Sequence, residues 1–300
     1  MWDIIPDIHG QWGKLAALLD QLGYRNAGGW KHSEGRRLLF LGDLIDRGPE
    51  NGMVIRTVRD LVEADRAVCI MGNHELNAVH FHNLSPRTGK PVRRRDDKNT
   101  HQHASFLAEF PLGGNQTADV IGWMAALPLW LDLGPLRAVH ACWHAPSVAA
   151  LPQRALELEE LMLAGHKDHA LFKPVDTLAK GPEILLPDGF TISDKQGIVR
   201  KKVRLAWWEA SPETWQDASI SVPEGQPLPD GAPELPRAFR YDAGDPPVFF
   251  GHYWLTGTPA LQARNALCMD YSAGADGPLL AYRWQEGPLD LARIVSTQDV

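Results

Sequence analysis

Cysteine is scarce in this chain. Only three cysteines occur among 300 residues, too few and too widely spaced for a disulfide framework. Each lies in an apolar stretch, where a buried thiol is the expected environment; they are Cys69, Cys142 and Cys268. The cysteine content therefore agrees with a reducing compartment and argues against a small, disulfide-stapled secreted domain.

Long apolar runs and a basic charge balance are also absent. No run approaches the roughly 20 residues that a membrane helix needs, and the opening MWDIIPDIHG has neither a basic start nor a small-residue cleavage site. We therefore expect a cytoplasmic protein that does not bind membranes. The net charge of -7 argues against broad binding to nucleic acid. The basic run VRRRDDK around residues 93–95 is a local exception, and such runs are typical of a solvated loop.

The first half of the chain alternates between short apolar runs and amphipathic stretches. The pattern predicts strands at WDII, RLLFL and RAVCIM and helices at QWGKLAALLDQL and NGMVIRTVRDLVEA. This β-α-β-α-β order indicates an α/β fold with a largely parallel sheet covered by helices. Residues 98–127 read as helical, and LPLWLDLG and LRAVHA read as paired strands joined by a Gly-Pro turn.

The regular pattern weakens between residues 151 and 245. Residues 182–247 hold ten of the 23 prolines, too many for a regular helix or a central strand. We predict a single domain with a core of residues 1–150 and 246–300 and an insertion or lid at 151–245, with a possible hairpin at 187–208. The core resumes with short strands at PVFFGHYW, ALCMDYS and LLAYRW.

Polar clusters follow the predicted core strands. After the first strand comes DIHG, after the second GDLIDRG, after the third GNHE, and later strands end in Val139-His140 and Gly251-His252. In an open α/β sheet the carboxyl ends of strands are where ligands collect, so these clusters are expected to converge. Converging acids and histidines would leave costly unpaired charges unless a cation binds them. Carboxylate, imidazole and amide ligands without thiolates favour Mn or Fe, with Zn as an alternative, over Ca or Mg.

These motifs resemble the metallophosphoesterase superfamily, and within it bacterial members of the calcineurin-like phosphoprotein phosphatase branch. The resemblance rests on PDIHG, GDLIDRG, GNHE, VHACWH and FFGHYW; it covers residues 2–75, with islands near His140 and His252, and does not extend across the insertion. Pro6 stands where the family usually has glycine, and HAC replaces the usual His-Gly-Gly or His-Ala-Gly. The resemblance implies a β-sandwich flanked by helices (α-β-β-α), with the insertion over the active-site face.

The family pattern implies two divalent cations, most naturally Mn. Asp7, His9 and Asp43 would bind one cation, and Asp43 would bridge to a second that is bound by Asn73, His140 and His252. A hydroxide shared by such metals attacks phosphorus in line. Arg47, together with Asn73, would bind the phosphoryl group, because a guanidinium offers a planar fork to two oxygens. His74 would protonate the leaving oxygen, and Asp46 would orient and charge its imidazole.

Each of these residues also has a purely structural interpretation. Asp43 and Asp46 are ordinary turn and cap residues in other contexts, and a histidine after a strand is often just hydrogen-bonded. Asn51 is a candidate cap of the helix that it begins. Glu75 is expected to support its loop through hydrogen bonds. Several other residues are left between a site role and a surface role: His144, His101, His103, residues 93–95 and Arg204.

The motifs therefore indicate a two-metal phosphoesterase, most simply a phosphomonoesterase or phosphoprotein phosphatase. The alternatives are a dinucleoside polyphosphate hydrolase and, further off, a phosphodiesterase or a nucleic-acid end-processing phosphatase. No kinase P-loop or ligase segment accompanies the motifs. A binding protein that has lost its chemistry is disfavoured because every ligand, the acid and the arginine are present. Fold alone does not choose among substrates.

Overall fold

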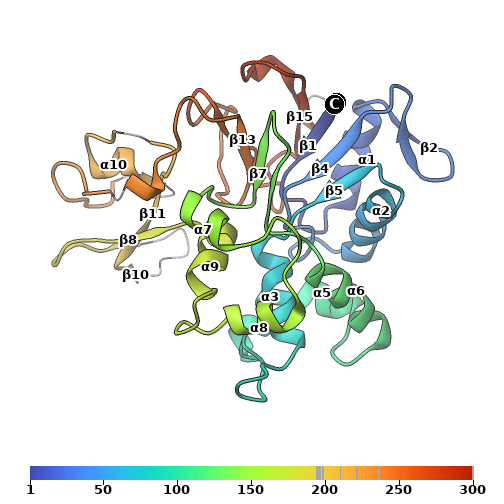
Figure 1. Cartoon of the computed structure of the whole chain (residues 1–300), viewed down its shortest axis with the longest axis horizontal. Coiled ribbons are helices and arrows are strands. Elements are labelled where there is room, and N and C mark those ends of the chain that lie inside the picture. Colours follow the sequence, from blue (N-terminus) through green and yellow to red (C-terminus); the bar gives the residue numbers. More distant parts are fainter. Residues whose placement is uncertain are drawn as a thin grey trace.

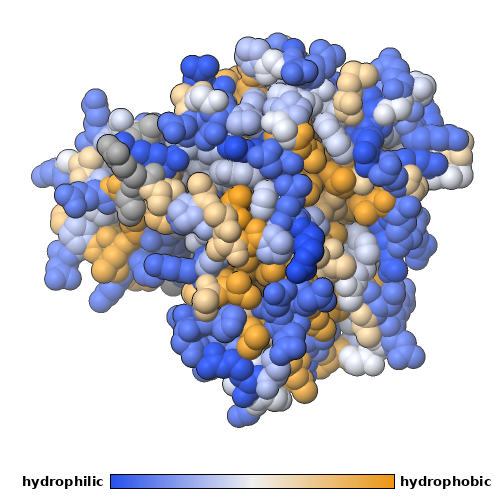
Figure 2. Space-filling view, viewed as in Figure 1, coloured by the Kyte–Doolittle hydropathy of each residue, from blue (hydrophilic) through white to orange (hydrophobic). Residues whose placement is uncertain are grey.

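The computed structural model describes residues 1–193, 197, 199–209, 211–220, 222, 223, 225–235 and 237–298. It shows a mixed α/β fold built around two facing sheets (Figure 1). No helix in the described ranges is long and apolar enough to cross a membrane. Figure 2 shows that most of one face is hydrophilic, with hydrophobic residues gathered mainly in its middle.

The first sheet has five strands, and its centre is parallel as the sequence predicts. Strand β1 pairs in parallel with β4, which pairs in parallel with β5, while β15 and β16 extend the sheet in antiparallel fashion. The spatial order is β16 (Ile294–Ser296), β15 (Leu280–Trp284), β1 (Trp2–Ile5), β4 (Arg37–Phe40) and β5 (Ala67–Cys69). The parallel centre places the carboxyl ends of β1, β4 and β5 at one edge.

The second sheet has four strands and packs against the first. Its order is β14 (Ala266–Cys268), β13 (Val248–Phe250), β7 (Arg137–Val139) and β6 (Trp130–Asp132). Strands β7, β13 and β14 are parallel, and β6 closes the edge in antiparallel fashion. Ile4 and Leu39 of the first sheet share a buried cluster with Ala138 and Phe249 of the second. The chain therefore forms the predicted sandwich.

Helices cover both outer faces of this sandwich. Because strand side chains alternate, Ile5 and Phe40 point away from the second sheet and pack with the apolar faces of α1 (Trp12–Gln21) and α2 (Asn51–Glu63). On the far side, α7 (Ala145–Ala150) and α9 (Phe172–Lys180) cover the second sheet, and the backbone N–H of Ala141 donates to Leu178. Helix α3 (Asn73–His82) begins directly after β5 and carries the GNHE motif.

Several short elements were not predicted from the sequence. They are the hairpin of β2 (Tyr24–Asn26) and β3 (Trp30–His32), strand β16, helix α8 (Leu158–Ala164) and helix α9. The stretch predicted as helical at 98–127 is divided into α4 (Asp97–Gln102), α5 (Ala104–Glu109) and α6 (Asn115–Ala125). Most of these elements are too short to show a clear period.

The described residues between 183 and 235 contribute the lobe at the left of Figure 1. The predicted hairpin is present as β9 (Ile192–Ser193) and β10 (Val199–Arg200), although residues 194–196 and 198 lie outside the described part. The other elements of this lobe are β8 (Glu183–Leu185), β11 (Lys202–Leu205), α10 (Trp215–Ala218) and β12 (Ser219–Ile220). Outside it, 3₁₀ turns occur at Arg237–Phe239 and at Leu291–Arg293. Strand β11 pairs with β8 and β12. Within the predicted insertion, α8 and α9 join the main core, and the division into core and insertion stays a prediction.

A buried ion pair in β1 joins this strand to the residue that precedes β4 and to β2. The Asp3 carboxylate is fully buried and accepts hydrogen bonds from Arg36 Nε at 2.9 Å and from the Tyr24 hydroxyl at 2.9 Å. Burial is the main reason that the Tyr24 hydroxyl resists ionisation, and the adjacent Asp3 carboxylate adds to it, so the pKa of Tyr24 is raised. The network satisfies groups that would be costly to bury alone.

We expect Arg36→Met to lower the free energy of unfolding by about 3 kcal/mol, because it removes the close ion-pair partner of the buried Asp3 carboxylate and leaves it only the Tyr24 hydroxyl and, at 3.8 Å, Arg283 Nε. Urea denaturation followed by circular dichroism measures the loss. The matched control is Arg59→Met, which removes a largely exposed pair with Asp119 and should cost no more than about 1 kcal/mol. Equal losses in the two variants would contradict this account.

Candidate metal centre and its surroundings

The predicted site residues converge where strands of both sheets end. Asp7 and His9 follow β1, and Asp43 follows β4 in the first sheet. His140 follows β7 and His252 follows β13 in the second sheet. Because β7 and β13 are parallel neighbours, their carboxyl ends lie together at the same end of the sandwich as those of β1 and β4. Residues more than 200 positions apart in the sequence thus become neighbours, as Asp7 and His252 show.

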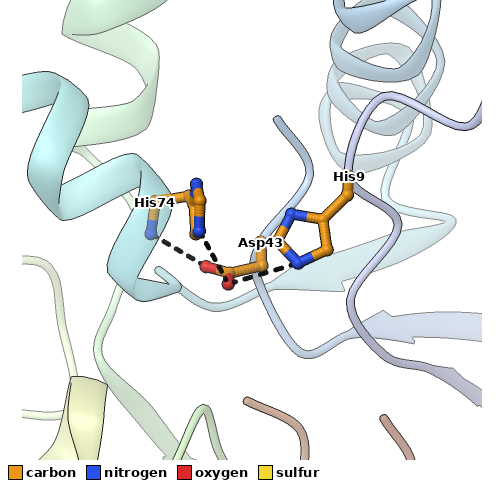
Figure 3. A group of neighbouring side chains, drawn as sticks. All are labelled: His9, Asp43 and His74. Carbon is orange, nitrogen blue, oxygen red and sulfur yellow. Dashed lines mark hydrogen bonds and ion pairs between the residues drawn. The ribbon is translucent and has the colours of Figure 1, made fainter. Parts of the chain in front are cut away.

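Asp43 belongs to two groups of side chains, and each group is able to hold a metal ion. In each group the candidate ligand atoms lie within 4.8 Å of one another; the groups are His9, Asp43 and His74, and Asp43, His140 and His252. His9 Nε2 lies 3.7 Å from Asp43 Oδ2, and His140 Nε2 lies 3.3 Å from Asp43 Oδ1. Figure 3 shows Asp43 between His9 and His74. The carboxylate is therefore placed to bridge two cations.

Asn73 and Asp7 occupy different positions around these groups. The Asn73 side-chain oxygen lies 2.6 Å from His252 Nδ1 and 3.1 Å from His140 Nε2, which places it with the second group. Asp7 falls in neither group; its buried carboxylate accepts the backbone N–H of His252 at 3.0 Å. Burial and then the nearby Asp270 carboxylate raise the pKa of Asp7. Asp270 was not predicted, and burial raises its own pKa to about 6.

The donor set fits divalent cations. Among the described residues, Nε2 of His9 and Nε2 of His252 are buried without a hydrogen-bond partner, as expected for atoms that bind a metal instead. Burial, followed by the charge of His74, lowers the pKa of His9 to about 4, and burial and then Arg204 lower the pKa of His252. Both rings are thereby held in the neutral form that coordinates metals.

Electrostatics around Asp43 favour its ionised form. Burial alone would raise the pKa of Asp43, but the His140 and His74 rings hold it well below its usual range. Burial likewise opposes a charge on His140, yet the Asp43 carboxylate raises the pKa of His140 to about 10. A bound cation would replace the positive charge of the protonated imidazoles, because it also stabilises the ionised form of the Asp43 carboxylate.

The backbone around the site is strained and tightly packed. His9, Asp43 and His252 have positive φ angles of 51°, 51° and 75°, a region that non-glycine residues rarely adopt. Gly42 packs so closely on Gly72 that an added Cβ would lie 2.3 Å from a backbone nitrogen. Glu75 spans this contact, since its carboxylate accepts the N–H groups of Asp43, Leu44 and Gly72 at 2.8–2.9 Å. The predicted supporting role of Glu75 is confirmed.

The charged residues of the DRG segment, Asp46 and Arg47, lie beside the candidate metal centre. Asp46 Oδ2 lies 2.6 Å from His74 Nδ1, as predicted, and Asp46 Oδ1 lies 2.8 Å from Nδ1 of His103, a residue to which the sequence assigns no single role. Arg47 is exposed and forms no ion pair among the described residues; its guanidinium lies 5.4 Å from the centre of the Trp254 ring. An unpaired guanidinium beside a metal centre is well suited to bind phosphate oxygens.

The cap predicted for α2 is wrong in its details. Glu50 is the N-cap residue, and the Asn51 side chain instead accepts the Asp46 N–H at 2.7 Å and donates to Gly48 at 3.1 Å. The first helical N–H groups donate to the Glu109 carboxylate at 2.6 Å and 2.9 Å. Asn51 thus stabilises the strained turn that carries Asp46, and Glu109 from α5 caps the first helical N–H groups of α2 instead. No pattern in the sequence around residue 109 predicted that Glu109 would cap α2.

The remaining candidates divide between the site and the surface. His144 stacks on Phe239 and bonds to Ser147, outside both metal groups. His101 is exposed, whereas His103 is buried. Arg204 on β11 is half-buried and close enough to His252 to lower its pKa, which brings the predicted insertion to the site. In the basic run, Arg94 and Arg95 are exposed and Arg93 is half-buried.

Comparison with known proteins agrees with this geometry. The family model described as calcineurin-like phosphoesterase matches residues 3–253. An asymmetrical bis(5'-nucleosyl)-tetraphosphatase PrpE from Halalkalibacterium halodurans is 46% identical over 74 residues, 24% of this chain and 30% of that protein. A symmetrical bis(5'-nucleosyl)-tetraphosphatase from Aromatoleum aromaticum is 31% identical over 170 residues, 56% of this chain and 54% of that protein. The chain thus spans less than a third of the length of the first relative and about half of that of the second.

A solved structure to which this chain is similar is that of a cold-active protein-tyrosine phosphatase from a Shewanella species. It is 17% identical to this chain, with a TM-score of 0.49, and the match covers 94% of this chain and 75% of that one.

We expect Asp43→Asn to remove most of the divalent metal from both positions at once, because the residue is shared by the two groups and its charge offsets both cations. Elemental analysis of the dialysed protein measures metal per chain. The matched control is Asp46→Asn, a neighbouring buried carboxylate outside both groups, which should keep its metal. Parental metal content in Asp43→Asn would refute the bridging assignment.

Proposed function

This chain belongs to the calcineurin-like phosphoesterase family, whose members are hydrolases with a binuclear divalent metal centre, and we propose that it cleaves phosphate monoesters with two cations held around Asp43. The observation that carries the proposal is that Asp43 is shared by two sets of candidate ligands. In the proposed assignment, one cation is held by Asp7, His9 and Asp43. The other is held by Asp43, Asn73, His140 and His252.

Mn is the proposed metal, with Fe and Zn as alternatives, because carboxylate, amide and imidazole donors surround the site and thiolates do not. Two such cations, when bound, supply Lewis acidity and an activated water. The protein contributes the rest. The strained loops hold the ligands in place, and Glu75 anchors the Asp43 loop to α3 by accepting three backbone N–H groups.

Arg47 and His74 are proposed to act on the substrate. Arg47 stands free of carboxylate partners in the described structure and offers two parallel N–H donors to phosphoryl oxygens, while Asn73 adds an amide at the same centre. Although burial favours a neutral His74 ring, the Asp43 and Asp46 carboxylates raise its pKa. A protonated imidazole is thereby available to donate to the leaving oxygen. His74 also lies in the first metal group, but its Nδ1 is held by Asp46.

A dinucleoside polyphosphate is the second candidate substrate. Two observations favour it: the two relatives described above are bis(5'-nucleosyl)-tetraphosphatases, and an open groove of about 970 Å³ adjoins the site through Trp254. The Trp254 ring lies 5.1 Å from His9 and beneath the Arg47 guanidinium, so the groove and the phosphate-binding arginine share one wall. Such space suits a large leaving group better than a small one.

One panel of substrates tests both candidates. The purified protein, loaded with Mn, is offered a nitrophenyl monoester, a nitrophenyl diester, a phosphopeptide and diadenosine tetraphosphate, and kcat/KM is measured for each. The proposal expects hydrolysis of the monoester and the phosphopeptide. A clear preference for diadenosine tetraphosphate would favour the second candidate, whereas no hydrolysis of any member by the metal-loaded protein would refute the proposed function.

His74→Asn should depress turnover of phenyl phosphate by about 10²- to 10⁴-fold, because that poor leaving group needs a proton. Nitrophenyl phosphate, which departs as a stable anion, should be affected much less. Asp46→Asn should show the same pattern more weakly, since it only orients the imidazole, and both variants should keep their metal. If His74→Asn slowed both substrates equally, the imidazole would be binding the phosphoryl group instead of protonating the leaving oxygen.

A further inference from the structure

Asp46 is contacted by a histidine at each of its carboxylate oxygens. His74 Nδ1 lies 2.6 Å from Oδ2, and His103 Nδ1 lies 2.8 Å from Oδ1. Burial would raise the pKa of Asp46, but the hydrogen bonds from His103 and His74 lower it to about 2. An ionised carboxylate can only accept hydrogen bonds, so both Nδ1 atoms must carry the proton. Asp46 therefore accepts one hydrogen bond from each of two imidazoles.

His103 is itself held firmly in place. It lies between α4 and α5, its ring stacks on Phe106 with centroids 4.6 Å apart, and it meets the edge of Phe81 at 5.3 Å. Its other nitrogen, Nε2, lies 3.1 Å from Nε2 of His82 at the end of α3. Burial, followed by the charge of His103, lowers the pKa of His82 to about 4, so His82 is available as a neutral partner. A polar chain thus runs from His74 through Asp46 and His103 to His82.

The position of Asp46 needs such support. Its φ angle is 70°, and that of Arg47 is 72°, so the turn that carries both residues is strained. On the backbone, Asn51 holds the Asp46 N–H. On the side chain, His103 is the only group besides His74 that bonds the carboxylate among the described residues. Without His103, the carboxylate would be free to turn away from His74 and seek another donor.

We propose that His103 is a positioning residue for the reaction: it donates from Nδ1 to Asp46 Oδ1 and so keeps Oδ2 directed at His74. The inference rests on the proposed function, because it assigns a task to the hydrogen bond that orients the acid. His103 touches neither the candidate ligands nor the place where the substrate phosphate would bind, and it acts through Asp46 alone.

Two substitutions separate this role from simple packing. His103→Phe keeps an aromatic ring to stack on Phe106 but removes the donor. His103→Asn loses the ring, yet its amide nitrogen stands near the former place of Nδ1 and can still donate to Asp46. If packing were the whole role, Phe would be the milder change; if the hydrogen bond matters, Asn would be milder. The exposed neighbour His101→Asn is the matched control.

In the Mn-loaded protein, His103→Phe should lower kcat for phenyl phosphate by about 10- to 100-fold, the usual cost of removing a group that orients a functional side chain. Turnover of nitrophenyl phosphate and the metal content should stay near those of the parent. His103→Asn should recover most of the loss, and His101→Asn should show none. Equal slowing of both esters, a Phe variant more active than the Asn variant, or full activity in His103→Phe would overturn the proposal.

A measurement without turnover keeps this test apart from the proposed function. Imidazole N–H protons bonded to a carboxylate resonate far downfield in proton NMR, so the parent, loaded with diamagnetic Zn because Mn would broaden these signals, should show signals from both His74 and His103. His103→Phe should remove one signal and shift the other, while His103→Asn should remove one and leave the other nearly unchanged. If the parent hydrolyses no ester but this pattern holds, the function fails and the positioning stands; an unshifted His74 signal in His103→Phe overturns the positioning. Should His103→Phe not fold, His103→Met takes its place in both tests.

Discussion

The buried carboxylate of Asp43 is the constraint on which the active end of the sandwich depends. It lies at the end of a first-sheet strand, but His140 and His252 around it come from the second sheet. A buried charge is costly unless it is matched, so the two sheets must meet with their histidines in register with this aspartate. Other hydrogen bonds join the two sheets at this end: His140 Nδ1 lies 2.7 Å from the Leu41 carbonyl oxygen, and the Asp7 carboxylate accepts the backbone N–H of His252.

Strain at this end of the molecule is offset by buried hydrogen bonds. Three residues that present side chains to the centre, His9, Asp43 and His252, adopt left-handed backbone angles, which cost roughly 1–3 kcal/mol each when unsupported. Glu75 and Asn51 meet the N–H groups that these turns expose, and Glu109 meets those at the start of α2. The loops are therefore fixed before any ligand arrives, which is what a site that must hold groups to within a fraction of an ångström requires.

Groups from outside the strand ends complete the site. The α4–α5 segment supplies His103, which contacts Asp46 in the strained turn, and Glu109, which contacts the start of α2 shortly after that turn. Strand β11 brings Arg204 near His252, and Trp254 forms a wall between the centre and an open groove. A common two-metal core is thus surrounded by features particular to this chain, and substrate choice is expected to lie in these features because the core itself is shared across the family.

The sequence by itself determined the strands β1, β4, β5, β7 and β13, the polar residues that follow them, and the expectation that those residues meet. It could do so because strand periodicity, turn residues and the rule for carboxyl ends are all local signals. Only the tertiary structure decided which atoms touch. The pairing of His103 with Asp46 joins residues 57 positions apart, and that of Glu109 with Asn51 joins residues 58 apart. The short strands and helices missed in the sequence likewise owe their conformation to neighbours, since a few residues carry no period of their own and gain stability from long-range packing.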